Sequence, residues 1–195
     1  GTPNEIVNNP DVRRYYLDWF KTLCFISSDL GSPSVGTQFA IFTHRDYDNP
    51  VRRSEMMKVA FDCWGELAEH GKRSGLTFLF WEPMSVGREF GHTIAETKAL
   101  QALLDAQGYA IPVEMMIDID HGDVTSPEPS DIDPYAWAET FPTQSRIIHI
   151  KQSSMNKGGH WPFTAQYNKD GRITPEKLLG AIKRGGGVNN EICLE

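Results

Sequence analysis

Five short apolar segments alternate with longer amphipathic segments, and this alternation constrains the fold more than any other feature of the sequence. Short, continuously apolar runs are typical of strands buried on both faces, and amphipathic segments between them are typical of helices. Strict alternation of the two predicts a parallel sheet with right-handed crossovers. The expected strands are 34–44 (SVGTQFAIFTH), 76–82 (LTFLFWE), 113–118 (VEMMID), 146–151 (RIIHIK) and 191–195 (EICLE).

Capping residues mark where the expected helices begin. Asn9 precedes Pro10, Thr93 is followed three residues later by Glu96 in a capping-box pattern, and prolines follow Asp133 and Thr174. The longest expected loop covers 152–173, and we expect a single domain over 1–195. The expected helices are 8–31, 51–75, 93–108, 133–141 and 174–187.

The strand count bears on the architecture of this α/β chain. A (β/α)8 TIM barrel has eight strands and typically about 250 residues, whereas five strands are expected here. The chain therefore corresponds either to the C-terminal part of a barrel, about strands 4–8 with the N-terminal strands absent, or to an open sheet. Because the chain ends on Glu195, at the C-terminal end of a strand with no helix after it, we favour the partial barrel.

A potential metal ligand stands at or near the end of every expected strand. These residues are Glu82, Asp118, His149, Glu195 and His44. Because the carboxyl ends of parallel strands meet on one face, which is the catalytic face of a barrel, we expect the first four to converge. Two glutamates, an aspartate and a histidine would make an oxygen-rich site for a divalent metal. Two alternatives stay open: Asp120 could replace Asp118 as the ligand, and His44 could equally lie in a solvated loop.

Bulk properties exclude other classes of protein. The net charge of −7 argues against a domain that grips a nucleic-acid backbone, although a local basic group could still bind one phosphate. No apolar run approaches the roughly 18 residues of a membrane span, and no signal segment opens the chain. The three scattered cysteines, Cys24, Cys63 and Cys193, are typical of reduced thiols, so we expect a cytoplasmic protein.

Four short motifs carry a resemblance to a known family. They are WEP at 81–83, DIDH at 118–121, HIK at 149–151 and CLE at 193–195. In these motifs the chain resembles the xylose-isomerase-like sugar-phosphate isomerases and epimerases, which include ketose 3-epimerases. The resemblance implies a TIM barrel and one divalent metal held by Glu82, Asp118, His149 and Glu195. It also implies that His121 contacts the substrate.

Longer stretches are similar to one branch of this family. The stretches 81–93, 118–126 and 149–164 resemble the branch that acts on tetrulose phosphates in erythritol breakdown. The chain departs from the family at Met155, because several ketose epimerases have a substrate-binding arginine at that position.

The expected chemistry is epimerisation at C3 of a ketose phosphate. A divalent metal would stabilise the enediolate that forms when the C3 proton leaves. Glu82 and Glu195 would act as acid and base on opposite faces of the sugar, and His121 would hydrogen-bond the C2 oxygen. Such oxygen-dominated ligation favours Mn²⁺, with Mg²⁺, Co²⁺ and Zn²⁺ as alternatives. The substrate-binding candidates further include Arg88, Lys151, Lys157, His160 and His44.

Three other functions compete with this interpretation. An aldose–ketose isomerase would use the same metal and bases. A phosphodiesterase of the endonuclease IV type shares the ligand order, and His44 and His121 could add ligands, but the Asp-x-His pair expected after the seventh barrel strand is missing. A non-enzymatic sugar-binding or scaffold fragment would not need the convergent ligands. We expect a small sugar phosphate as partner, no nucleic acid and no membrane, and we leave self-association into a homo-oligomer open.

Overall fold

A single parallel sheet organises the computed structural model, which describes residues 9–154 and 157–194. Its strands lie in the order β1, β2, β3, β4, β7, and every neighbouring pair is parallel. The sheet is therefore parallel, as predicted, and its strands follow the order of the chain. The strands are β1 Ser34–Gln38, β2 Phe78–Glu82, β3 Val113–Asp118, β4 Ser145–Ile150 and β7 Glu191–Leu194.

Helices connect successive strands of the sheet, as the alternation predicted. Four of the five longest begin directly after the predicted caps, and α4 begins after Asn49, which was not among them. The Asn9 side chain accepts hydrogen bonds from the backbone of Asp11 and Val12, and that of Asp133 accepts one from Tyr135. The helices are α2 Pro10–Asp29, α3 His44–Tyr47, α4 Pro50–Arg73, α5 Ile94–Asp105, α6 Pro129–Ile132, α7 Pro134–Thr140, α8 Ala165–Asn168 and α9 Pro175–Arg184, with a 3₁₀ turn η1 at Gly87–Glu89.

The capping box of α5 ties the helix to the loop that follows β2. Thr93 Oγ1 accepts a hydrogen bond from Glu96 N at 3.1 Å, as the pattern predicts. Glu96 Oε2, however, accepts from Gly91 N at 3.0 Å and from His92 N at 3.2 Å. The glutamate therefore holds the backbone of the β2–α5 loop, which begins at the end of a strand that carries a predicted ligand.

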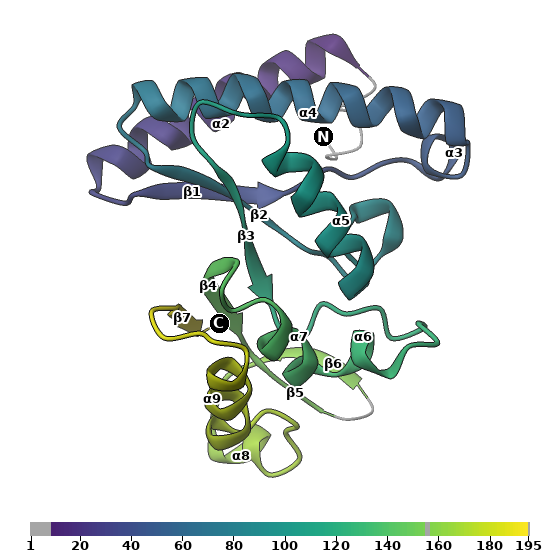
Figure 1. Cartoon of the computed structure of the whole chain (residues 1–195), viewed down its shortest axis with the longest axis vertical. Helices are drawn as coiled ribbons and strands as arrows, with labels where there is room; N and C mark the ends of the chain where they lie inside the picture. The colour runs from purple at the N-terminus through teal and green to yellow at the C-terminus, as the bar shows by residue number, and fades with distance from the viewer. Residues whose placement is uncertain (1–8, 155–156, 195) are drawn as a thin grey trace.

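Buried aromatic side chains hold the helices on the sheet. In Figure 1, α2 and α4 lie together beside β1, and α7 and α9 lie together beside the other end of the sheet. Two tryptophans bury their rings while their indole N–H groups find acceptors: Trp64 donates to Phe39 O at 3.0 Å and Trp81 to Gln101 Oε1 at 2.8 Å. The strands are thus supported by a packed core.

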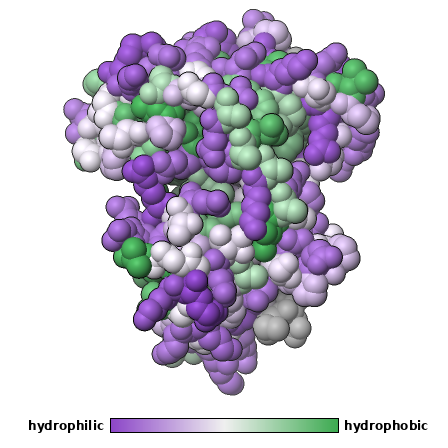
Figure 2. All heavy atoms as spheres, viewed as in Figure 1, coloured by the Kyte–Doolittle hydropathy of each residue, from purple (hydrophilic) through white to green (hydrophobic). Residues whose placement is uncertain are grey.

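The face of the molecule shown in Figure 2 is largely hydrophilic. In the space-filling view, hydrophilic residues cover most of the face shown, and apolar residues appear in separate patches (Figure 2). Among the described residues, no helix has the length and apolar character needed to cross a membrane.

Two local expectations were wrong. The first predicted strand ends at Gln38 and not at His44: residues 39–43 follow it outside the sheet, and Thr43 then caps a short helix by accepting a hydrogen bond from Asp46 N. The predicted loop 152–173 holds further structure. It contains an antiparallel pair, β5 Gln152–Ser154 with β6 Lys157–Trp161, and the short helix α8.

Candidate metal centre

Three predicted ligands lie at the carboxyl ends of neighbouring strands. Glu82 is the last residue of β2, Asp118 is the last residue of β3, and His149 is the last but one of β4. Asp118 and His149 stand opposite each other in the register of β3 and β4. Their side chains therefore meet at one edge of the sheet, where the parallel arrangement was expected to bring them.

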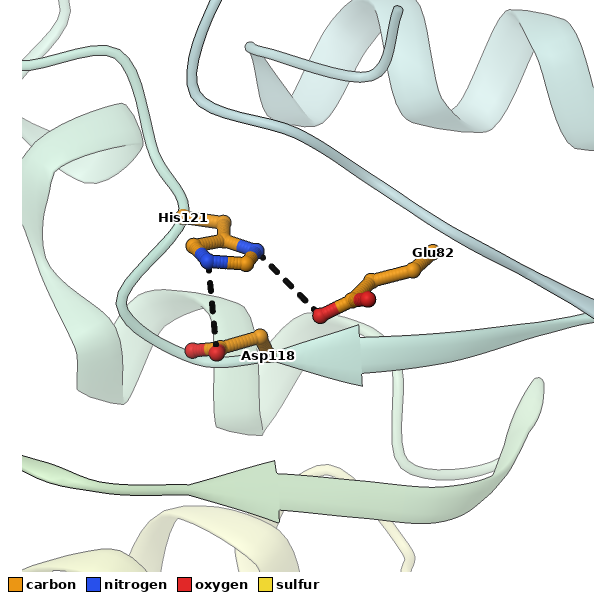
Figure 3. Close-up of side chains that lie close together, drawn as sticks. All are labelled: Glu82, Asp118 and His121. Carbon is orange, nitrogen blue, oxygen red and sulfur yellow. Dashed lines mark ion pairs between the residues drawn. The ribbon is translucent and has the colours of Figure 1, made fainter. Parts of the chain in front are cut away.

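His121 completes a compact group with the two carboxylates. Its Nδ1 lies 3.3 Å from Glu82 Oε1 and its Nε2 lies 3.4 Å from Asp118 Oδ2 (Figure 3). One ligand atom from each of Glu82, Asp118 and His121 lies within 4.8 Å of the other two. His149 Nδ1 stands 3.8 Å from Glu82 Oε1 and 3.7 Å from Asp118 Oδ2. Two carboxylates and the His121 imidazole thus form one compact group, and the His149 imidazole stands beside it.

The turn after β3 sets the orientation of Asp118 and His121. Asp120 N donates a hydrogen bond to Asp118 Oδ1 at 2.9 Å, and His121 N donates to Asp118 O at 3.3 Å. His121 Nδ1 also lies 3.2 Å from Pro83 O, which a protonated Nδ1 can use as an acceptor. The imidazole is therefore held between the end of β2 and the end of β3.

Charge around His121 favours its protonated form. Burial by itself lowers the pKa of the imidazole, but the hydrogen bond with Glu82 and the negative charge of Asp118 outweigh that effect, although Lys151 opposes them. The net result is a raised pKa for His121.

Lys151, which directly follows β4, places a positive charge inside the group. Its side chain is only 3% exposed, and its Nζ lies 2.7 Å from Asp118 Oδ2. The same Nζ lies 2.9 Å from His121 Nε2 and 3.1 Å from His160 Nε2. The predicted substrate-binding residues Lys151, His121 and His160 therefore lie together beside the carboxylate.

The donor set fits a divalent cation. Asp118 is fully buried, and its Oδ2 makes no well-aligned hydrogen bond in the described part of the chain, so its negative charge depends on nearby positive charge. Buried carboxylates are commonly paired or coordinate a metal. Carboxylate and imidazole donors together suit Mn²⁺, Mg²⁺, Co²⁺ or Zn²⁺. Glu82, Asp118, His149 and His121 are the described residues that could hold such an ion.

His44 and Arg88, two other predicted site residues, contact other parts of the chain. His44 is on α3 with its side chain 82% exposed, so the solvated alternative is the one observed. Arg88 donates to Phe42 O at 3.4 Å and lies 3.1 Å from Glu89, which links the loops after β1 and β2. Lys157 begins β6 opposite Ser154. The predicted second catalytic glutamate, Glu195, lies outside the described residues.

Sequence reasoning missed two contributors to the site, the carbonyl of Pro83 and the side chain of Arg172. The carbonyl of Pro83 contacts His121, and any residue type could have supplied that group, so no sequence signal marks it. Asp120, considered above as an alternative ligand, instead pairs with Arg172. In the sequence Arg172 stands in a polar stretch beside the apolar Ile173. Ile173 is buried in the structure, and its apolar character is the sequence signal that this segment is packed against the core.

Comparison with known proteins places this geometry in context. No family model matches the chain. The chain is 65% identical over 185 residues to the D-erythrulose 1-phosphate 3-epimerase of Brucella abortus (strain 2308), an alignment that covers 95% of the chain. The chain spans 60% of the length of that relative.

Solved structures show the same architecture. A proposed xylose isomerase from Rhodospirillum rubrum is 26% identical with a TM-score of 0.82, covering 95% of this chain and 61% of that one. D-psicose 3-epimerase from Clostridium cellulolyticum H10 is 14% identical with a TM-score of 0.65, covering 99% and 60%. A xylose isomerase-like TIM barrel protein from Mycobacterium smegmatis, in complex with magnesium, is 17% identical with a TM-score of 0.57, covering 93% and 60%.

These likenesses confirm the resemblance stated from the motifs. The chain aligns with 61% and 60% of the Rhodospirillum rubrum and Clostridium cellulolyticum structures, and its own sheet has five parallel strands in the order of the chain. The chain therefore has the fold of the xylose-isomerase-like TIM barrels, of which its described sheet forms a part.

Proposed function

We propose that the protein is a divalent-metal-dependent epimerase that acts at C3 of a ketose phosphate, and specifically of a tetrulose phosphate. The observation that carries this proposal is the group formed by Glu82, Asp118 and His121, whose ligand atoms all lie within 4.8 Å of one another at the strand ends. The identity of 65% to a relative named D-erythrulose 1-phosphate 3-epimerase supports the choice of substrate.

Glu82 is suited to move the C3 proton. It ends β2, its side chain is 19% exposed, and its Oε1 faces His121, so it lies at the site without being sealed from a substrate. We assign the opposite face of the sugar to Glu195, which then returns a proton to C3 from the other side. Inversion at C3 needs such a pair, because a single base would return the proton to the face it came from.

A bound divalent ion would polarise the C2 carbonyl of the substrate and stabilise the negative charge that develops on proton removal. We assign its ligands to Glu82, Asp118, His149 and Glu195. We favour Mn²⁺, and the magnesium complex of the Mycobacterium smegmatis protein supports a hard divalent ion in this fold.

His121 and Lys151 are suited to bind the sugar. The His121 ring stands between Glu82 and Asp118, at 3.3 and 3.4 Å, so we assign it as a hydrogen-bond donor toward the C2 oxygen. Lys151 Nζ lies between Asp118, His121 and His160, so we assign it to the hydroxyl end of the substrate. Lys157, His160 and Arg88 stay candidates for the phosphate end, because a phosphate needs cationic and N–H donors. The three free cysteines support a reducing compartment, and we propose the cytoplasm.

The decisive experiment follows solvent deuterium into the substrate. The full-length protein is incubated with Mn²⁺ and tetrulose or pentulose phosphates in D₂O, and the label is located by NMR. We expect label at C3 with inversion, and much less label with Glu82→Gln. Glu114→Gln, on β3 and paired with Arg146, is the matched control and should label C3 as the unchanged protein does.

Other outcomes would redirect the assignment. Label confined to C1 or C2 would identify an aldose–ketose isomerase. A folded, metal-loaded protein that labels no sugar would contradict the proton-transfer chemistry, and phosphodiester substrates would then be tested.

A further inference from the structure

Arg172 joins three segments behind the metal centre. It lies between α8 and α9, and its side chain is 13% exposed. The guanidinium donates from Nε to Ser153 Oγ at 3.0 Å and from Nη1 to Ile132 O at 3.3 Å, and its Nη2 pairs with the carboxylate of Asp120. One side chain therefore connects β5, the end of α6 and the turn after β3.

The backbone of Arg172 is fixed as well. Its N–H donates to Ser153 O at 2.8 Å, and its carbonyl accepts a hydrogen bond from the Tyr135 hydroxyl at 2.6 Å. Since both the main chain and the guanidinium are anchored, the direction in which the positive charge points is set by the surrounding structure. Asp120 receives that charge with a carboxylate that is 1% exposed.

Asp120 in turn contacts the ligand group directly. Its backbone N–H donates to Asp118 Oδ1 at 2.9 Å, which leaves Asp118 Oδ2 facing His121 Nε2 at 3.4 Å and His149 Nδ1 at 3.7 Å. His121 is the next residue along the chain. The position of Asp120 therefore decides both which oxygen Asp118 presents and where the His121 ring stands.

We propose that Arg172 is a positioning residue for the metal centre. Through its ion pair with Asp120 it holds the turn from Asp118 to His121 in the orientation that presents Asp118 Oδ2 and the His121 imidazole to the bound ion and substrate. This inference rests on the proposed function to the extent that the group binds a metal.

The chemistry of the side chain explains why an arginine stands here. Its three partners lie in different directions, and the planar guanidinium offers donors in a fixed fork that can reach all of them. A lysine carries one point charge and could pair with Asp120 without also holding Ser153 and Ile132. Outer-shell contacts of this kind orient metal ligands, and their loss typically weakens metal affinity or activity by about 10- to 100-fold.

The experiment measures metal binding and ring position without any sugar. Arg172→Gln and Arg172→Lys are made in the full-length protein, with Arg146→Gln as control because Arg146 also pairs with a carboxylate but is 57% exposed. Mn²⁺ affinity is read by electron paramagnetic resonance, and the His121 ring nitrogens are followed by ¹⁵N NMR. Circular dichroism verifies that each variant is folded.

We expect Arg172→Gln to bind Mn²⁺ about 10- to 100-fold more weakly and to shift the His121 ring signals. Arg172→Lys should fall between this variant and the unchanged protein, while Arg146→Gln should match the unchanged protein. Because both residues act through one contact, adding Asp120→Asn to Arg172→Gln should cause little further loss.

A folded Arg172→Gln protein with unchanged Mn²⁺ affinity and unchanged His121 signals would overturn the proposal. If Arg172→Gln fails to fold, Arg172→Lys decides the question with the same two readouts. Unchanged protein that binds no Mn²⁺ would count against the proposed function, and the His121 signals would still decide whether Arg172 positions the turn.

Discussion

Lys151 Nζ lies 2.7 Å from Asp118 Oδ2, and both side chains are almost fully buried, at 3% and 0% exposed. Removing one partner of a buried ion pair strongly destabilises the folded protein, because the remaining charge is then buried without either water or an opposite charge beside it. Lys151 lies nearer to this oxygen than the His121 imidazole, whose Nε2 is 3.4 Å away, so the pair belongs both to the stability of the fold and to the chemistry of the site.

Lys151→Met should therefore lower the free energy of unfolding by about 3–5 kcal/mol when measured without added metal. Saturating Mn²⁺ should reduce the difference, because a bound cation would also compensate Asp118. Urea denaturation with and without Mn²⁺ measures both effects. Lys21→Met is the matched control: Lys21 pairs with Glu66 at 2.6 Å, but these side chains are 21% and 37% exposed, so the cost should be about 1 kcal/mol or less. Equal losses in the two variants would contradict this prediction.

Asp118→Asn should weaken Mn²⁺ binding by more than the roughly 10- to 100-fold typical of changes outside the ligands. The amide removes the charge while keeping the size of the side chain and the acceptor for Asp120 N. Isothermal titration calorimetry measures the affinity, and chelation of the metal by EDTA should abolish epimerisation in the unchanged protein. Glu114→Gln, on the same strand, should keep its Mn²⁺ affinity; a parallel loss there would point to damage to β3 instead of to a ligand.

Gly91→Ala tests how the loop after β2 supports the site. Gly91 has a φ of 79°, and an added Cβ would stand 2.8 Å from Pro83 Cβ and 2.9 Å from Pro83 Cα. Pro83 follows Glu82, and its carbonyl contacts His121, so any displacement of Pro83 reaches the metal centre. We expect Gly91→Ala to lower both the melting temperature and the Mn²⁺ affinity.

Gly108→Ala is the control, because it adds backbone strain at a positive φ without displacing a neighbouring residue. Gly108 also has a positive φ, of 65°, but an added Cβ there would meet nothing within 4 Å. Its cost should be limited to the roughly 1–2 kcal/mol of the left-handed conformation, with Mn²⁺ affinity unchanged. If both alanine variants bind Mn²⁺ normally, the loop does not position the site.

His92 should make stability depend on pH. Its Nδ1 hydrogen-bonds the Glu96 carboxylate, and this contact raises the pKa of His92 although burial opposes the charged form. Asp123, 4.0 Å from its Nε2, adds to the increase. A raised folded pKa means that the stabilisation is fully present below the unfolded value of about 6.5 and is lost as pH rises through the folded value.

The destabilisation caused by His92→Gln should therefore be larger at about pH 5.5 than at about pH 9. Urea denaturation at the two values measures it, and proton NMR of His92 gives the pKa directly. His44→Gln removes an imidazole that is 82% exposed and should change stability little. A His92 effect that is independent of pH would show that the charged pair contributes no stability.

Local sequence signals accounted for most of the elements. Asn9, Thr93 and Asp133 cap helices where the sequence placed caps, because a capping side chain bonds backbone groups only two or three residues away. The buried strands that end in Glu82 and Asp118 were also predicted correctly, since short continuous apolar runs of that length are typical of buried strands. The first strand was overextended to His44 because Phe39 and Phe42 are buried without being part of the sheet.

The sequence by itself thus determined the order of strands and helices and which edge of the sheet would carry the carboxylates and imidazoles, because hydrophobic period and capping act over a few residues. Only the tertiary structure decided that Lys151 turns inward onto Asp118, that Pro83 supports His121, and that Arg172 reaches Asp120. These contacts join residues up to 52 positions apart, and a buried charge pairs with whichever partner the packed fold brings within reach.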